Sequence, residues 1–305
     1  QGVEPAAFAA QQAELWKSGL AKWNQDGERI ARLKSAADFT MKIGFATRAD
    51  QNEDWANWYK EAVEKRSGGR IEVKSFPSGQ LGTPQRMIEG AQLGTIEAIL
   101  LPADFYVGLD QRYGVFSIPA LFRDMRHAAN TLASPAFNKE ILDMGESKGL
   151  TGVTTFVYSV AHYLGKQPIR TLDDFKNKKI RINATPAERE RMRVLGATGV
   201  PMALNDVIPA FERGTIDAAE WVGPYDDEKL GFNKVAKFYY YPGWWEGGPE
   251  LDLFVNIKEY NALPAEYKAI LEAACHEANL SMMAKYDALN PAALKRLIAN
   301  GVKFA

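Results

Sequence analysis

The stretch GTIEA at residues 94–98 returns almost unchanged as GTIDA at residues 214–218, and this recurrence decides how the rest of the chain is read. Each copy follows a segment of helical character, residues 84–93 in the first case and 206–213 in the second. A glycine that ends a helix adopts the left-handed conformation and lets the chain turn back into a sheet. The repeat therefore predicts equivalent helix-to-strand turns in two α/β domains of similar design, with chance recurrence as the alternative.

Short elements of alternating type surround the first copy. Apolar and alternating stretches predict strands at residues 39–47, 70–76 and 95–101. Helices are predicted between them at residues 55–65 and 84–93, and the first of these ends at a Ser-Gly-Gly stop signal. This order of strands and helices favours a largely parallel sheet with helices on its faces.

The same order surrounds the second copy. Strands are predicted at residues 179–184 and 199–204, with a helix at 186–195 that is rich in charge and is expected to present a solvated face. Asn205 is expected to cap the helix at 206–213. The second domain therefore repeats the design of the first.

Two apolar segments, residues 156–164 and 249–256, are predicted to cross between the domains as strands, and an amphipathic helix at 265–289 is expected to brace both from outside. The predicted fold class is α/β, with two lobes joined by crossover strands. Each lobe is a mostly parallel sheet with flanking helices. Two such lobes leave a cleft between them, where small ligands usually bind, so the expected activity is binding with lobe closure.

The domain boundaries follow from these elements. Residues 1–38 form an N-terminal helical segment. Lobe I comprises residues 39–157 plus 249–288, and lobe II comprises residues 158–248 plus 289–305.

Composition excludes several classes of partner. The net charge of −1 gives no overall field to attract nucleic acid or an anionic membrane.

A single cysteine, Cys275, excludes an intrachain disulfide. No apolar run approaches the roughly 20 residues that span a bilayer. The N-terminus lacks a secretion-signal pattern, which leaves a cytoplasmic protein or an exported one without its signal.

Arg181 is the first candidate for ligand binding. It alternates with Ile180 and Ile182 on a predicted strand, and a guanidinium can hold a carboxylate through two hydrogen bonds. Glu220 and Trp221 end the strand after the second turn, where they can orient Arg181, hold a cation or accept a ligand hydroxyl. The alternatives are a solvated arginine at a sheet edge and a packed tryptophan beside a surface glutamate.

Further candidates follow the first turn and lie on the crossover strand. Asp104 and Tyr106 come after the strand of the first lobe and are expected to face the cleft. Tyr158 and His162 share one face of the crossover strand. The aromatic, glycine-flanked segment at residues 239–250 either lines a pocket or seals a core.

Enzyme signatures are sparse. The three histidines, His127, His162 and His276, are far apart and lack metal-ligand spacing. The chain contains no nucleophile elbow, no zinc-protease motif and no phosphate loop. An enzyme of the same architecture, with Glu220 as general base and His162 as acid, is the alternative to a binding protein.

Several blocks taken together resemble a known family. FPSGQLGTPQRMIEGAQLGTIEA, KNKKIRINA, LGATGVPMAL, ERGTIDAAEWVGPYDDEKLGFNKVAKFYYYPGWWE and LPAEYKAILEAA occur in the order found in the extracytoplasmic solute-binding proteins of tripartite ATP-independent periplasmic (TRAP) transporters. The resemblance covers residues 39–305. EWVGPYDD followed by YYYPGWWE is most similar to the branch that binds small 2-oxo and 2-hydroxy monocarboxylates.

The resemblance implies a periplasmic receptor, in mature form without its signal peptide, that captures a small organic acid and delivers it to the TRAP membrane permease. The arginine of KIR, Arg181, becomes the carboxylate anchor. Glu220, Trp221 and Tyr106 become pocket residues. The glycine-rich segment places Trp244, Trp245 and Glu246 near the cleft floor.

Two departures from the family pattern shape these expectations. The 2-oxo-acid branch holds a metal ion with a crossover glutamine and the glutamate of EW. Here the aligned position is about Val160, which argues against a metal or other cofactor at Glu220. Family members also continue past GVKFA with helices, and the N-terminal segment is expected to fill the space of those helices.

Overall fold

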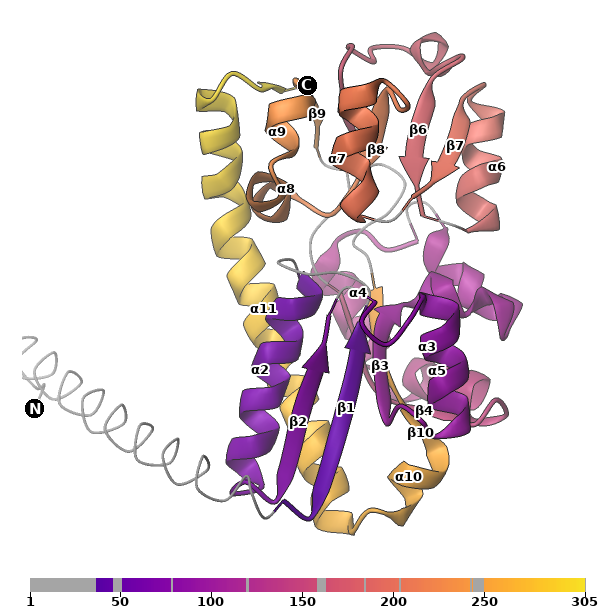
Figure 1. The fold of residues 1–305 in the computed structure, drawn as a ribbon, viewed down its shortest axis with the longest axis vertical. Helices are drawn as coiled ribbons and strands as arrows, with labels where there is room; N and C mark the ends of the chain where they lie inside the picture. Colours follow the sequence, from indigo (N-terminus) through magenta and orange to yellow (C-terminus); the bar gives the residue numbers. More distant parts are fainter. Residues whose placement is uncertain are drawn as a thin grey trace, which may run out of the picture.

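The computed structural model shows a two-lobed α/β protein with one sheet above the other (Figure 1). It describes residues 37–45, 51–77, 79–118, 121–157, 163–183, 185–202, 204–241, 243 and 250–304. The predicted fold class is confirmed. All but the last two residues of the predicted N-terminal segment lie outside the described residues, so its packing stays a prediction.

The first lobe is built on a five-stranded sheet in the order β2-β1-β3-β10-β4. Its strands are β1 (Phe39–Phe45), β2 (Ile71–Phe76), β3 (Ala98–Pro102), β4 (Leu150–Val157) and β10 (Glu250–Asn256). β1 pairs in parallel with β2 and β3, whereas β10 runs antiparallel between β3 and β4. The segment predicted to cross back at 249–256 is therefore an inner strand of this sheet.

Helices cover both faces of the first sheet. The helices of the first lobe are α2 (Gln51–Arg66), α3 (Pro84–Leu93), α4 (Met125–Leu132), α5 (Pro135–Glu146), α10 (Ile257–Ala262) and the 3-10 helices η2 (Ala103–Gly108) and η3 (Gln111–Ser117). Along β3, Ala98 and Leu100 belong to the apolar cluster on the α2 side, and Ile99 and Leu101 belong to the cluster on the α3 side. Burial of both faces explains why the strand has no polar alternation.

The second lobe has a six-stranded sheet in the order β11-β9-β5-β8-β6-β7. Its strands are β5 (Tyr163–Gly165), β6 (Lys179–Ile182), β7 (Thr198–Pro201), β8 (Ala218–Glu220), β9 (Phe238–Tyr240) and β11 (Lys303–Phe304). β6 pairs in parallel with β7 and β8, and β5 runs antiparallel to β8 and β9. β4 and β5, which hold the two ends of the predicted crossover at 156–164, thus belong to different sheets.

The helices of the second lobe are η4 (Leu172–Phe175), α6 (Pro186–Val194), α7 (Leu204–Arg213), α8 (Pro224–Leu230) and α9 (Phe232–Val235). The prediction that Asn205 caps α7 is wrong. The helix already includes Leu204, so Asn205 lies inside its first turn.

Helix α11 (Ala265–Ala299) runs along the side of both lobes (Figure 1). It packs against α2 and β4 of the first lobe and against α8 of the second. The predicted end near residue 289 is wrong, although Pro291 removes a helical hydrogen bond. Buried Asn290, Ala293 and Leu297 hold the helix against the second lobe beyond that point. Within the described residues, no helix combines the length and apolarity needed to cross a membrane.

The predicted equivalence of the two turns is confirmed. Gly94 and Gly214 have φ values of 79° and 72°, in the left-handed region. In the first turn the amides of Thr95 and Ile96 donate to the carbonyl of Gly90, and in the second the amides of the corresponding Thr215 and Ile216 donate to Ala210. The strands begin at Ala98 and Ala218, so the residues from glycine to acid form the connection.

The acidic residue of each turn also has the same role in both lobes. The Glu97 carboxylate accepts a hydrogen bond from the amide of Lys42 in β1 at 2.9 Å. The Asp217 carboxylate accepts one from the amide of Lys179, at the start of β6, at 2.8 Å. Each turn thus ties a helix end to the neighbouring parallel strand, which explains why the acid recurs in the sequence.

Candidate functional site

Arg181 lies on an inner strand of the second sheet. β6 runs between β8 and β7, so its residues are not at a sheet edge. Only 4% of Arg181 is exposed, and the neighbouring Ile180 and Ile182 are buried as well. The alternative of a solvated edge arginine is therefore wrong.

Groups from three segments hold the Arg181 guanidinium. Its Nε donates to the Met202 carbonyl at 3.1 Å, and its Nη2 donates to Asn183 Oδ1 at 2.9 Å. Its Nη1 donates to the Glu220 carbonyl at 3.2 Å and also pairs with the Glu220 carboxylate. The guanidinium carbon lies 4.5 Å from the centre of the Trp221 ring. These contacts fix the orientation of a buried cation.

Three carboxyl groups, contributed by both lobes, interact electrostatically with this guanidinium. Burial raises the pKa of Glu220 to about 8, and Glu188 and Asp104 add to the rise while Arg181 opposes it. Burial raises the pKa of Asp104 to about 7, with a further contribution from Glu188. Burial also raises the pKa of Glu188. Arg191 also opposes the rise in pKa at Glu220 and Glu188, so the site combines three buried carboxyl groups with two arginines that only partly offset the cost of burying them.

Asp104 comes from the first lobe, at the start of η2 directly after β3. Its Oδ1 is buried and has no hydrogen-bond partner. The segment carrying Asp104 continues into η3, which contacts α6, the helix that carries Glu188. Asp104 therefore brings a polar group of the first lobe to the charged groups of the second.

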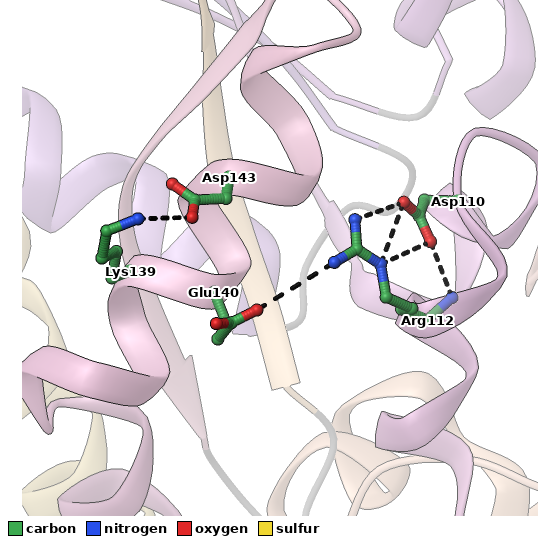
Figure 2. A network of polar contacts seen from close by, with 5 residues as sticks. All are labelled: Asp110, Arg112, Lys139, Glu140 and Asp143. Carbon is green, nitrogen blue, oxygen red and sulfur yellow. Dashed lines mark hydrogen bonds and ion pairs between the residues drawn. The ribbon is translucent and has the colours of Figure 1, made fainter.

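The η3 segment is anchored to its own lobe by a network of charged side chains (Figure 2). Arg112 donates to the carboxylate of Asp110, with Nη2 to Oδ2 at 2.8 Å, and the Arg112 amide donates to Oδ1 at 2.9 Å. Arg112 Nη1 also lies 4.0 Å from Glu140 of α5. Nearby on α5, Lys139 pairs with Asp143 one turn later. Asp110 and Arg112 fix the start of η3, and the contact of Arg112 with Glu140 links it to α5.

Trp221 is buried directly after β8. Only 7% of the residue is exposed, and its ring contacts the Arg181 guanidinium and lies 6.2 Å from the centre of the Phe232 ring. Its Nε1 is buried without a hydrogen-bond partner. Trp221 thus supplies an apolar wall beside the cation and one uncommitted donor.

Tyr106 occupies a different environment from the one expected. Its ring is fully buried in the core of the first lobe, 4.7 Å from the Phe254 ring and 5.5 Å from the Tyr113 ring. The structure gives the ring a packing role, and a ligand contact by Tyr106 stays a prediction. Three other candidates, Tyr158, His162 and Trp245, lie outside the described residues.

Glu188 belongs to the site although the sequence reading missed it. The expected solvated face of α6 holds for Glu190 and Arg193, which are exposed and paired with each other, but Glu188 is only 6% exposed. Its amide donates a hydrogen bond to Thr185 Oγ1 at 3.2 Å. The Thr-x-x-Glu pattern of a capping box was the available signal, because it ties this glutamate to the helix start.

The described residues contain no group of three His, Cys, Asp or Glu side chains that could hold a metal ion. Glu220, which the sequence had suggested as a cation ligand, instead pairs with Arg181.

Comparisons with known proteins agree with this architecture. Residues 45–305 match the family described as bacterial extracellular solute-binding protein, family 7. A Nostoc protein named as a monocarboxylate 2-oxoacid-binding periplasmic protein is 37% identical over 254 residues, which are 80% of this chain and 68% of that protein. The 2,3-diketo-L-gulonate-binding periplasmic protein of Escherichia coli is 27% identical over 252 residues, 80% of this chain and 74% of its own.

Solved structures give the same result. A TRAP periplasmic solute-binding protein of Xanthobacter autotrophicus with bound β-D-galacturonate has a TM-score of 0.79 and 25% identity, covering 87% of this chain and 88% of that one. A TRAP protein of Pseudomonas putida with bound D-glucuronate has a TM-score of 0.78 and 26% identity, covering 87% and 86%. The resemblance seen in the sequence is confirmed: this chain belongs to the bacterial extracellular solute-binding proteins of family 7, the receptors of TRAP transporters.

Proposed function

We propose that this protein is a periplasmic receptor that captures a small organic acid in the cleft between its lobes and delivers it to the membrane permease of a TRAP transporter. One observation carries the proposal: a buried, oriented arginine of the second lobe lies among acidic groups contributed by both lobes. The names of the relatives, which include a 2-oxoacid-binding and a diketogulonate-binding periplasmic protein, support both the compartment and the ligand class.

The chemistry of capture follows from the pairing of Arg181. A buried guanidinium requires a counter-charge, and Glu220, its partner in this structure, supplies that charge in full only above its raised pKa of about 8. A ligand carboxylate can take over that role, because a guanidinium and a carboxylate form paired, charge-assisted hydrogen bonds. Asp104 approaches from the other lobe, so a ligand that contacts both sides favours the closed arrangement.

The alternative of an enzyme finds no such support. It requires Glu220 as a free base, whereas the structure pairs the Glu220 carboxylate with Arg181. Prolonged incubation with candidate acids followed by mass spectrometry separates the two ideas. We expect recovery of unchanged acid from a stoichiometric complex, and accumulation of product would instead establish an enzyme.

Replacing Arg181 tests the proposed function directly. We expect Arg181→Ala to lose about 2–5 kcal/mol of binding free energy for organic acids, roughly 30- to 4,000-fold in Kd, because the ligand carboxylate loses its charged partner. Isothermal titration calorimetry, with ligands first identified by native mass spectrometry of the purified protein, provides the measurement.

Two further variants serve as controls for this test. Arg193→Ala removes an exposed arginine from the same lobe and should bind as the wild type does. The double variant Arg181→Ala with Glu220→Gln removes the unpaired carboxylate that the single change leaves behind, so a folding defect is distinguished from a binding defect. A folded Arg181→Ala protein with wild-type affinity would contradict the proposed role.

A further inference from the structure

Nearly all N–H donors of Arg181 already have hydrogen-bond partners within the protein. A guanidinium has five N–H donors. Four hydrogen bonds engage them, to Met202, Asn183 and two oxygens of Glu220, which leaves one N–H on Nη2 for a ligand. While Glu220 stays in place, the arginine therefore offers a ligand only this one N–H donor.

Two other polar atoms at the site are buried and uncommitted. Asp104 Oδ1 is an acceptor without a donor, and Trp221 Nε1 is a donor without an acceptor. A buried polar group without a partner is costly, so such groups in a binding site mark positions that a ligand completes. Both atoms belong to residues that interact with Arg181, one electrostatically and one by stacking.

Different functional groups complement this pair of atoms to different degrees. A hydroxyl group carries one donor and two acceptor positions, which suits one buried acceptor and one buried donor. A keto oxygen only accepts, so it leaves Asp104 unsatisfied once that carboxyl group is ionised, above its pKa of about 7. An ammonium group only donates and brings three N–H groups, so it leaves the donor of Trp221 unsatisfied.

We propose, building on the proposed function, that Asp104 is a specificity-determining residue that accepts a hydrogen bond from a hydroxyl group of the bound acid. The Trp221 indole donates to an oxygen of the same ligand. The protein therefore selects hydroxylated carboxylic acids over their 2-oxo and deoxy counterparts. This sets its expected preference apart from that of the Nostoc relative, which is named for binding 2-oxo acids.

Matched pairs of acids test the proposal by calorimetry at pH 8.5, above the pKa of about 7 of Asp104, so that its carboxylate only accepts. The pairs are lactate with pyruvate, 2-hydroxy-4-methylpentanoate with its 2-oxo form, and 2-hydroxyglutarate with 2-oxoglutarate; propanoate, 4-methylpentanoate and glutarate serve as deoxy controls. For the pair that binds the wild type most tightly, we expect the hydroxy acid to bind at least about tenfold better than the other two forms, because they leave Asp104 unpaired.

Variants assign the preference to its residue. Asp104→Ala should weaken the hydroxy acid so that the three forms bind within about threefold of one another, while the 2-oxo and deoxy forms change little. Asp104→Asn keeps an acceptor oxygen and should retain part of the preference. Asp143→Asn, which changes an exposed carboxylate of the same lobe, should behave as the wild type does.

The outcomes separate the two proposals. If the wild type binds the 2-oxo acid as tightly as the hydroxy acid, or if Asp104→Ala weakens all forms equally, the role of Asp104 is overturned while Arg181-dependent binding stands. If no acid of the panel binds, or if binding survives Arg181→Ala unchanged, the proposed function falls together with the inference that rests on it.

Discussion

Arg181 illustrates what alternation along a strand can and cannot predict. The sequence placed it opposite Ile180 and Ile182 and identified a guanidinium suited to a carboxylate. Its burial, however, depends on β6 lying between β8 and β7, which only the strand order decides. The sequence therefore predicted that an arginine on a strand could bind a carboxylate, but it did not predict that the arginine is buried.

The titration of Glu220 leads to a prediction about pH. Burial raises its pKa from 4.5 to about 8, so the folded chain binds more protons than the unfolded chain between those values. The free energy of unfolding should therefore fall as the pH rises through this window. Asp104, whose pKa burial raises to about 7, acts in the same direction.

Urea unfolding of the wild type and Glu220→Gln at pH 5, 7 and 8.5 measures this effect. The glutamine cannot ionise, so the variant should lose less stability across the range than the wild type. Glu190→Gln, which changes an exposed glutamate of α6, provides the control and should follow the wild type. Parallel curves for Glu220→Gln and the wild type would show that Glu220 does not titrate in this window.

Asp104 and Glu188 show which features of a site the local sequence does not predict. Asp104 was predicted to face the cleft because it follows a strand. In the structure it interacts electrostatically with Arg181. Glu188 was read as part of a solvated face because its neighbours alternate in charge. Which charges of a polar helix become buried depends on what packs against it, and that information lies in the other lobe.

The two glycine turns are the elements that the sequence predicted best. Their hydrogen-bond patterns coincide because a glycine in the left-handed region, a small polar residue and an isoleucine form the same connection twice. Helix ends away from such signals were predicted less well. α7 includes Leu204 ahead of the expected cap, and α11 continues past Pro291, because tertiary packing outweighs local preference at those positions.

The left-handed conformation of Gly214 can be tested without steric interference. A Cβ added there meets nothing within 4 Å, so Gly214→Ala isolates the backbone effect. We expect a loss of about 1 kcal/mol in the free energy of unfolding, measured by urea denaturation. Gly108→Ala is the matched control, because its added Cβ also meets open space while its φ lies outside the left-handed region. Equal effects of the two changes would refute the backbone explanation.

Charged contacts link the two lobes along the α11 side of the molecule. Asp54 of α2 lies 2.7 Å from Lys285 Nζ of α11 and 3.6 Å from Lys229 Nζ of α8. Lys229 also pairs with buried Asp226 at 3.1 Å. A carboxylate of the first lobe therefore meets two cations, one of them on a helix of the second lobe.

Removing that carboxylate should weaken the joint between the lobes. We expect Asp54→Asn to lower the free energy of unfolding by about 1 kcal/mol at low salt, and by less in 1 M NaCl because salt screens partly exposed charges. Asp143→Asn breaks a pair within one exposed helix and should cost only about 0.3–0.5 kcal/mol. Urea denaturation at both salt concentrations gives the comparison, and equal losses for the two variants would speak against a special role for Asp54.

The two-lobed plan itself was predictable, since repeated turns and two crossover segments require two sheets joined twice. Strand order was not predictable, because nothing in residues 249–256 states that they insert between β3 and β4. The sequence also could not predict how Asp104 and Arg181 are placed relative to each other, because this depends on how far the lobes close.

The inner position of β10 has a consequence for how the chain is made. Synthesis proceeds from the N-terminus, so β3 and β4 emerge long before the strand that joins them. Until residue 256 has left the ribosome, each of these strands presents an unfinished edge that can pair with other chains. The first lobe therefore cannot be completed before β10 has been made, and until then the growing chain depends on protection from aggregation.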